Sequence, residues 1–486
     1  MLALADPKLL CDALYIDGAW VRPPGADVLE VTNPATGEVL SRLPQASREQ
    51  TVQAIEAAEA AMGDWSALPA KERSKYLRRW YDLIVDNVDD LARILTAEQG
   101  KPLQEARGEI LYGAAFFEWY AEEAKRVYGE TIPAPSADQR LLVLRQPIGV
   151  CAAITPWNFP MAMIPRKAAP ALAAGCTMVL KPASATPLSA LALAELAGRA
   201  GIPPGVFSVV PGRASVVGDE LLTSRIVRKI TFTGSTEVGR ELMAKAAGTI
   251  KKVSLELGGN APVLVFDDAD IDVAVAGALA SKFRNMGQTC VCANRIYAQS
   301  GIYDEFVKRF SAAVAALKVG DGFDDGVQQG PLIDEAAVRK TEEHLGDAVA
   351  RGAEIVAGGS RHALGGTFFE PTVVAGATVD MLVAHEETFG PLAPVFRFET
   401  EEEAIRLAND TEYGLAAYFF TRDNARIWRV GEALEFGVVG VNAGIISYEG
   451  APFGGFKASG IGREGSRHGI EEFLELKYLC VAEIGA

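Results

Sequence analysis

The sequence predicts an α/β protein with mostly parallel sheets, divided into two domains and carrying a short β arm. Three observations predict this. The 486 residues exceed what a single hydrophobic core organises. From residue 149 onward, short apolar runs of strand character alternate with helical segments. A proline-containing stretch with a different pattern, residues 128–146, interrupts the chain before that alternation starts.

The first predicted elements, within residues 47–125, are helices. Ser47 and Gln50 have the spacing of a capping box, and apolar residues then recur at helical intervals as far as Gly100. The segment Gly100-Lys101-Pro102 breaks the pattern, and a further helix is expected over residues 103–125. Prolines and the alternating LLVLR run then predict an exposed arm or hairpin strand.

Two α/β regions follow. Between residues 149 and 265, runs such as VCAAIT, CTMVLKP and KITFTGS alternate with helical segments, which indicates βαβ units. The same alternation continues from residue 270 to about residue 450, and the terminal ELKYLCVAEI is expected to be a strand. Parallel sheets of this kind bind ligands at the carboxyl ends of their strands.

Composition excludes several classes of protein. The formal net charge is −16, which gives no global positive field for nucleic-acid binding. The N-terminal residues do not have the pattern of a signal peptide, and no run approaches the roughly 20 apolar residues of a membrane span. We therefore expect a cytoplasmic protein without a membrane partner. Its six cysteines have no zinc-type spacing, and neither a metal site nor a disulfide framework is expected.

The segment FRNMGQTCVCANR, residues 283–295, contains a candidate catalytic nucleophile. It places Cys290 in a turn between a predicted helix and a predicted strand. A thiol in such a turn can be exposed and activated as a nucleophile. The alternative is a small buried residue, the commoner fate of an isolated cysteine.

Two further segments offer groups that a nucleophile needs. Glu256, in SLELGGNAP, ends a predicted strand beside two glycines and could act as a general base. Asn158, in TPWNFP, is a side-chain amide in a turn and could stabilise an oxyanion. The alternatives are a solvated or salt-bridged Glu256 and an Asn158 that bonds its own turn.

A phosphate-binding turn is expected at Gly234-Ser235 in FTGSTEVG, where a strand runs into a helix whose first amides are free. The dinucleotide fingerprint itself occurs at Gly460-x-Gly462-x-x-Gly465. No strand precedes it and no βαβ unit follows it, so it is rejected as a phosphate site.

Together these segments resemble the aldehyde dehydrogenase superfamily along essentially the whole chain. LELGG, GQTC, EETFGP and PFGGFKASGIGRE occur in the family's order. The chain is most similar to the bacterial NADP-dependent succinate-semialdehyde dehydrogenases, through FRNMGQTCVCANR, ETFGPLAPVFRF and GIISYEGAPFGGFKASG. It departs from that subgroup at Pro165, where a Thr is expected, and at Tyr448, where a polar residue is common.

The resemblance implies an oxidation of succinate semialdehyde, and of glutarate semialdehyde, to the dicarboxylic acid through a thioester on Cys290. Asn158 and the Cys290 amide would stabilise the oxyanion, and Glu256 would activate the hydrolytic water. An aldehyde dehydrogenase of broader or different specificity is the alternative. The residues implied in cofactor binding are Thr155, Pro156, Trp157, Lys181, Ser184, Gly234, Ser235, Leu257, Glu387 and Phe389.

The cofactor preference is inferred from Ser184. Relatives strict for NAD often carry a Glu three residues after the Lys that stands here at position 181. A serine removes the repulsion between that carboxylate and a 2′-phosphate. We therefore expect NADP to be preferred and NAD to be accepted as well.

The resemblance also implies that Arg166, Arg284 and Ser447 bind the distal carboxylate of the substrate, with Arg166 and Arg284 on helices. Surface salt bridges are the alternative for the two arginines. Cys292, two residues from the nucleophile, could form a disulfide with Cys290 under oxidation, or could simply pack as a small residue.

The resemblance implies two Rossmann-like domains. Residues 1–127 and 147–255 would bind the dinucleotide, and residues 256–455 would be catalytic. Residues 128–146 and 470–486 would form an arm that assembles a homodimer or homotetramer. Three other functions are the alternatives: a phosphorylating or CoA-acylating dehydrogenase, which does not need Glu256; an inactive relative; and a cysteine hydrolase, which needs a histidine that the motifs lack.

Overall fold

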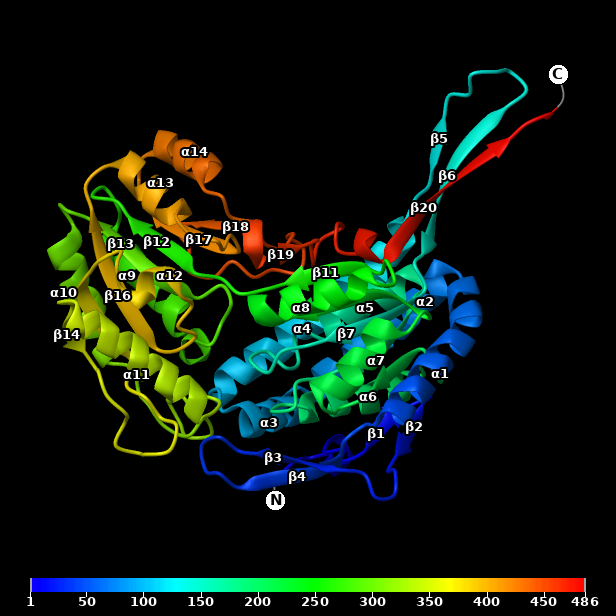
Figure 1. Ribbon diagram of the computed structural model, residues 1–486, viewed down its shortest axis with the longest axis horizontal. Coiled ribbons are helices and arrows are strands. Elements are labelled where there is room, and N and C mark those ends of the chain that lie inside the picture. The colour runs from blue at the N-terminus through cyan, green and yellow to red at the C-terminus, as the bar shows by residue number, and fades with distance from the viewer. Residues whose placement is uncertain (1, 485–486) are drawn as a thin grey trace.

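A mixed sheet of eight strands forms the larger half of the molecule in the computed structural model, which describes residues 2–484 (Figure 1). Its order is β19-β11-β10-β7-β8-β9-β1-β2, and the five strands from β11 to β9 are parallel. The parallel strands are β7 (Val150–Ile154), β8 (Thr177–Lys181), β9 (Phe207–Val209), β10 (Val227–Thr233) and β11 (Lys252–Glu256). The antiparallel edges are β1 (Leu14–Ile16), β2 (Ala19–Val21) and β19 (Gly460–Ile461).

The second sheet has seven strands in the order β14-β15-β16-β13-β12-β17-β18, all parallel to their neighbours except β14. Its strands are β12 (Ala261–Val265), β13 (Ala293–Gln299), β14 (Glu354–Ala357), β15 (Thr372–Ala377), β16 (Leu392–Phe398), β17 (Ala416–Phe420) and β18 (Val438–Val441). The predicted α/β class with mostly parallel sheets is confirmed.

Helices surround both sheets, and those that follow β7 connect successive strands. Around the first sheet they are α1 (Arg48–Ala67), α2 (Ala70–Asp86), α3 (Val88–Gln99), α4 (Leu103–Glu123), α5 (Pro165–Ala174), α6 (Leu188–Ala200), α7 (Asp219–Thr223) and α8 (Thr236–Ala247). Around the second they are α9 (Ile271–Phe283), α10 (Tyr303–Ala315), α11 (Glu335–Ala350), α12 (Leu382–His385), α13 (Glu401–Asn409) and α14 (Asn424–Ala433). The predicted capping box is present at the start of α1.

Short helical turns lie between these elements. They are η1 (Pro7–Leu9), η2 (Ala124–Arg126), η3 (Ala214–Gly218), η4 (Arg284–Gly287), η5 (Lys457–Ser459) and η6 (Glu471–Phe473). A hairpin of β3 (Val28–Thr32) and β4 (Val39–Pro44), which the sequence did not predict, forms a separate two-stranded sheet. Among residues 2–484, no helix is long and apolar enough to cross a bilayer.

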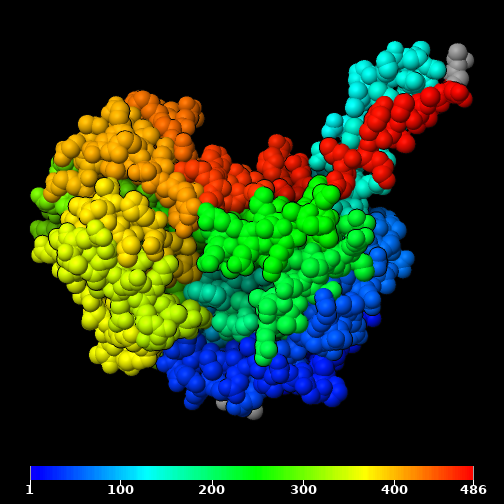
Figure 2. All heavy atoms as spheres, viewed as in Figure 1, coloured from blue at the N-terminus to red at the C-terminus, as the bar shows by residue number. Residues whose placement is uncertain are grey.

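The predicted arm is a three-stranded antiparallel sheet that projects from the body (Figures 1 and 2). It joins β5 (Glu130–Ile132) and β6 (Arg140–Pro147) to the C-terminal strand β20 (Leu474–Val481). In a sheet with one face covered, every second side chain of β20 would be buried. Here these side chains are exposed, Leu476 and Tyr478 among them.

One local expectation was wrong. Helix α9 ends at Phe283, so Arg284 lies in the following turn η4 rather than on the helix. Strand β19 pairs with β11 at an edge of the first sheet. The C-terminal segment (red in Figure 2) therefore returns from the second sheet to the first before it enters the arm. The division into domains by residue number stays an interpretation.

Candidate active site

The carboxyl ends of three adjacent parallel strands bring together the segments singled out in the sequence. Strands β7, β10 and β11 are neighbours, and Asn158, Gly234 and Glu256 lie at or just after their ends. Cys290 comes from the second sheet, just before β13. Gly259 lies so close to the carbonyl oxygen of Cys290 that a Cβ at position 259 would collide with it. The site therefore forms where the two sheets meet.

A turn with unusual backbone geometry presents Cys290. Asn285 and Met286 have φ values of 51° and 55°, in the left-handed region that side chains with a Cβ rarely adopt. Gly287, with φ 76°, packs directly against the backbone of Gly390. Strain of this kind persists where surrounding contacts impose it, and it concentrates at functional sites. The Cys290 side chain at the end of this turn remains partly exposed, which makes the inert, buried alternative a poor description of it.

The electrostatic surroundings of Cys290 keep its thiol protonated. Burial raises the pKa of Cys290 to about 12, Arg166 opposes this increase, and Glu387 and Glu256 add to it. Since the thiolate is the nucleophilic form, activation requires either added positive charge or a base nearby.

Glu256 supplies a base in the same place. Its side chain is 4% exposed, and its Oε2 atom has no hydrogen-bond partner among the described residues. The backbone is fixed by β11 and by the Gly234 N–H, which donates to the Glu256 carbonyl at 3.1 Å. Burial, and then the charge of Glu464, raise the pKa of Glu256 well above its usual range. A carboxyl group with a raised pKa and an unpaired oxygen suits a general base better than a salt bridge.

Asn158 is held as a fixed donor rather than as part of its own turn. It is buried, and its Nδ2 donates to the carbonyl of Gln288, two residues before Cys290, at 2.9 Å. Its own carbonyl accepts from Asn285 Nδ2 at 3.0 Å and from Lys101 Nζ at 2.7 Å. Lys101 was not singled out in the sequence, where it marks only the break between two helices.

Lys181, at the end of β8, has the surroundings of an anion-binding group. Its side chain is buried, its hydrogen bond goes to the carbonyl of Pro182 at 3.2 Å, and no carboxylate of residues 2–484 pairs with it. Burial alone lowers the pKa of Lys181 to about 8. Ser184 lies exposed in the loop that follows, before α6. A buried lysine without a carboxylate suits the phosphate of a dinucleotide.

The predicted phosphate turn has the expected strand–turn–helix form. Strand β10 runs into Gly234, and the Ser235 side chain caps α8 by accepting from the Val238 N–H at 3.4 Å. Leu257, after β11, packs against Gly239 of α8, where a Cβ would collide with it. The free amides at the start of α8 suit a pyrophosphate. The rejected fingerprint has turns instead of an α-helix after β19, unlike the βαβ unit of a dinucleotide site.

The remaining cofactor candidates border the same region. The rings of Trp157 and Phe389 meet edge to face, with centroids 5.5 Å apart. Phe389 has a φ of 56°, and Glu387 beside it accepts from the Gly259 N–H at 3.1 Å, while burial raises the pKa of Glu387 to about 7. Thr155 and Pro156 lie at the end of β7, and the Thr155 N–H donates to the carbonyl of Lys181 at 3.2 Å.

Arg166 lies in the first turn of α5 and is buried, so the surface salt bridge proposed as its alternative is wrong. Its Nε lies 2.9 Å from Glu464 Oε2, and its Cζ lies 4.1 Å from the centre of the Phe453 ring. Its Nη2 is buried without a hydrogen-bond partner among the described residues. Glu464, which also pairs with Lys167, was missed in the sequence because a charged residue in a loop shows no sign of burial.

Arg284 and Ser447 line a cavity of about 630 Å³ between α4 and α9. Arg284 Cζ lies 4.9 Å from the centre of the Phe159 ring. Tyr112 of α4, also missed in the sequence, lies between the candidates. Burial raises its pKa, while Arg166, Arg284 and Ser447 all act to lower it. Cys290 and Arg166 are not among the residues that line this cavity. Tyr448, the departure beside Ser447, is 58% exposed.

Both cysteines of the turn are free thiols. Cys292 is buried, and its Sγ lies 3.0 Å from the carbonyl of Lys282 in α9, to which it donates. Cys290 is the more accessible of the two.

Known proteins resemble the chain over its whole length. The sequence pattern of the aldehyde dehydrogenase family matches residues 20–479. A glutarate-semialdehyde dehydrogenase of Pseudomonas aeruginosa is 63% identical over 483 residues, covering 99% of this chain and 100% of the relative. The NADP(+) succinate-semialdehyde dehydrogenase GabD of Escherichia coli is 61% identical over 480 residues, covering 99% and 100%.

The likeness extends to three dimensions. The crystal structure of a succinate-semialdehyde dehydrogenase from Burkholderia pseudomallei matches with a TM-score of 0.98 at 60% identity, covering 99% of this chain and 100% of that one. A cysteine, a carboxylate and a carboxamide at the junction of two parallel sheets agree with these matches. The chain belongs to the aldehyde dehydrogenase family.

Proposed function

We propose that this chain oxidises succinate semialdehyde, and also glutarate semialdehyde, to the dicarboxylic acids, with NADP preferred and NAD accepted. The observation that carries the proposal is the convergence of Cys290, Glu256 and Asn158 near two arginines. Arg166 pairs with Glu464 but keeps Nη2 without a hydrogen-bond partner among the described residues, and Arg284 lies over the Phe159 ring. The relatives named for succinate and glutarate semialdehydes, each about 60% identical over their full length, support this substrate class.

The geometry supports the following catalytic roles. The Cys290 thiolate, formed when the thiol gives its proton to solvent water, attacks the aldehyde carbon. The oxyanion of the resulting hemithioacetal accepts hydrogen bonds from Asn158 Nδ2 and the Cys290 N–H. In the structure, Asn158 Nδ2 donates to the Gln288 carbonyl at 2.9 Å, so the amide is held close to the backbone that carries the nucleophile. Oxidation of the hemithioacetal leaves a thioester on Cys290.

A bound nicotinamide dinucleotide supplies the hydride acceptor for that oxidation. The unpaired Lys181 and the exposed Ser184 would hold the adenosine ribose and its 2′-phosphate, and the start of α8 would hold the pyrophosphate. Glu387 and Phe389 would border the nicotinamide ribose and ring.

Hydrolysis of the thioester is assigned to Glu256. Its unpaired Oε2 is free to accept a proton from water, and its raised pKa makes the carboxylate a stronger base than an ordinary glutamate. This group favours the free acid as product over an acyl phosphate or an acyl-CoA, neither of which requires a base for water.

Arg166, Arg284 and Ser447 would bind the distal carboxylate. A panel of aldehydes with and without a terminal carboxylate, run with both cofactors, tests the proposal. We expect higher kcat/KM for the carboxylated aldehydes, and a sharp rise in KM for succinate semialdehyde, but little for an uncharged aldehyde, in Arg284→Ala. Equal losses on both substrates would instead indicate an aldehyde dehydrogenase of broader specificity. Glutarate semialdehyde differs by one methylene, worth about 1–3 kcal/mol in a pocket, and is expected to be used as well.

The pair Cys290 and Cys292 is proposed as a redox switch. Peroxide would oxidise Cys290 to a sulfenic acid, and the Cys292 thiol would displace water from it to form a disulfide. The proximity of the two residues in the chain and the accessibility of Cys290 support this.

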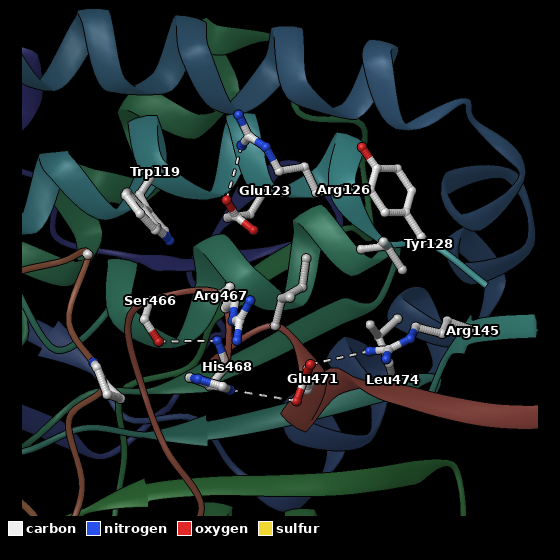
Figure 3. A pocket seen from close by; sticks show the side chains of 14 residues that line it. Trp119, Glu123, Arg126, Tyr128, Arg145, Ser466, Arg467, His468, Glu471 and Leu474 are labelled. Atoms are coloured by element: carbon white, nitrogen blue, oxygen red, sulfur yellow. Dashed lines mark hydrogen bonds and ion pairs between the residues drawn. The ribbon is translucent and has the colours of Figure 1, made fainter. Parts of the chain in front are cut away.

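The arm is proposed to assemble a homodimer or homotetramer. Leu476 and Tyr478 are exposed on one face of strand β20, and such an apolar patch marks an interaction surface. At its base is a hollow of about 610 Å³, in which Arg145 pairs with Glu471 (Figure 3). Sedimentation of Leu476→Asp should show a smaller species than the wild type; an unchanged mass would exclude this surface.

A further inference from the structure

A buried ion pair lies directly behind Asn158. Lys101 Nζ is 2.6 Å from Glu109 Oε2, and both side chains are 1% exposed. Removing two charges from water costs several kcal/mol per ion, which the attraction between them repays only with good geometry and further hydrogen bonds. A pair of this kind is therefore weak evidence of stability, and its contacts indicate what it does instead.

Among the described residues, every further hydrogen bond of these two side chains is to the turn that carries Asn158. Lys101 Nζ donates to the Asn158 carbonyl at 2.7 Å and lies 3.9 Å from the centre of the Phe159 ring. The other oxygen of Glu109 accepts from the N–H groups of Met161 and Ala162, at 3.0 and 3.1 Å. The two side chains thus hold the turn at four points over five consecutive residues.

The turn needs external support because it has no regular structure of its own. It lies between the end of β7 and the start of α5. The backbone fixes the position of Lys101. Gly100, with a φ of 93°, ends α3 just before it, and the Lys101 N–H donates to Gln99 Oε1 at 2.9 Å. Glu109 projects from α4. Two helices of the first half of the chain therefore fix the position of the proposed oxyanion donor.

We propose that Lys101 and Glu109 are positioning residues for Asn158, which hold its side-chain amide at the place where the oxyanion forms. The inference rests on the oxyanion role proposed for Asn158. Glu109 also lines the cavity that contains Arg284 and Ser447, whereas Lys101 does not, so the test of positioning rests on Lys101. Their effect passes through the backbone of the turn.

Positioning predicts a specific kinetic result. A displacement of a catalytic group by about 1 Å can cost about a hundredfold in rate. Lys101→Met should therefore lower kcat at least about tenfold for charged and uncharged aldehydes alike, while KM for the dinucleotide changes little. Lys101→Arg, which keeps the charge, should recover part of the loss. Glu109→Gln, which keeps the acceptor for the turn but removes the charge, should lower kcat by less than Lys101→Met.

The decisive measurement is kcat for Asn158→Ala, Lys101→Met and the double variant, with cofactor binding and thermal melting followed for each. Lys251→Met is the matched control, since Lys251 is also buried and donates to carbonyls, among them that of Val227 at 2.8 Å, away from the site. It should retain wild-type kcat. If the melting curve shows that Lys101→Met is unfolded, Lys101→Arg and Glu109→Gln replace it in this comparison of single and double variants.

The outcomes separate this inference from the proposed function. If Lys101→Met lowers kcat in the wild-type background but lowers it little further in Asn158→Ala, the pair acts through Asn158. If the two losses multiply, or Lys101→Met retains kcat, the positioning role is wrong while the function stands. Full activity in Asn158→Ala would overturn the oxyanion role and this inference with it.

Discussion

The guanidinium of Arg166 and the carboxylate of Glu464 form a buried ion pair, with Nε and Oε2 2.9 Å apart and both side chains almost excluded from solvent. Burial alone would raise the pKa of Glu464, but Lys167 and Arg166 hold it below the usual value. Glu464 in turn raises the pKa of Glu256. The proposed substrate arginine and the proposed general base therefore belong to one electrostatic cluster.

Breaking this pair from one side should destabilise the protein. Arg166→Met leaves Glu464 with Lys167 as its remaining partner, and a broken buried pair costs about 3–5 kcal/mol. Urea denaturation at neutral pH should show that loss in the free energy of unfolding. Adding Glu464→Gln to Arg166→Met should restore part of it. If the double variant lost as much free energy of unfolding as the two single variants together, the result would contradict the coupling.

Replacing Glu256 should separate acylation from hydrolysis. In Glu256→Gln the thioester still forms, but no carboxylate accepts the proton of the attacking water. Rapid mixing should then show a burst of reduced cofactor close to one equivalent, followed by a steady rate lower by about 10²–10⁴-fold. A uniform fall with no burst would show that Glu256 acts before the thioester.

Cofactor affinity should depend on pH through Lys181. Burial lowers the pKa of Lys181 to about 8, and only its protonated form attracts a phosphate. The Kd for NADP should therefore rise above that pH, by up to about tenfold per unit, whereas the Kd for NAD should change less.

Fluorescence titration of both cofactors between about pH 7 and about pH 9.5 measures this. Lys181→Met should flatten the NADP profile. A profile that stays equally steep in that variant would assign the dependence to another group.

Cys292 should protect Cys290 from irreversible oxidation. With both thiols present, activity lost to peroxide should return on adding a dithiol, since a disulfide is reducible. In Cys292→Ala the sulfenic acid on Cys290 has no neighbouring thiol and should oxidise further, beyond recovery. Identical recovery in the two proteins would exclude the switch.

The parallel sheets and the arm could be predicted because both depend on local patterns of apolar residues. The motifs likewise singled out Cys290, Glu256 and Asn158. Strand ends bring Asn158, Gly234 and Glu256 together in any parallel sheet of this order. The partners of these groups could not be predicted. Lys101, Glu109 and Glu464 appear in the sequence as ordinary charged residues, and only tertiary packing buries them.

Arg284 illustrates the same limit on a smaller scale. Its sequence neighbours continue the helical pattern, but the chain leaves the helix at Phe283 and enters left-handed turns at Asn285 and Met286. Non-glycine residues in that conformation have no signature in a single sequence, because tertiary contacts impose it.

The central claim is that the sulfur of Cys290 forms the covalent intermediate. The most direct test is the rate of dinucleotide reduction by Cys290→Ser with succinate semialdehyde, alongside a cofactor-binding measurement that shows the protein is folded. The account predicts normal cofactor binding and no reduction above background. Reduction at the wild-type rate would contradict it.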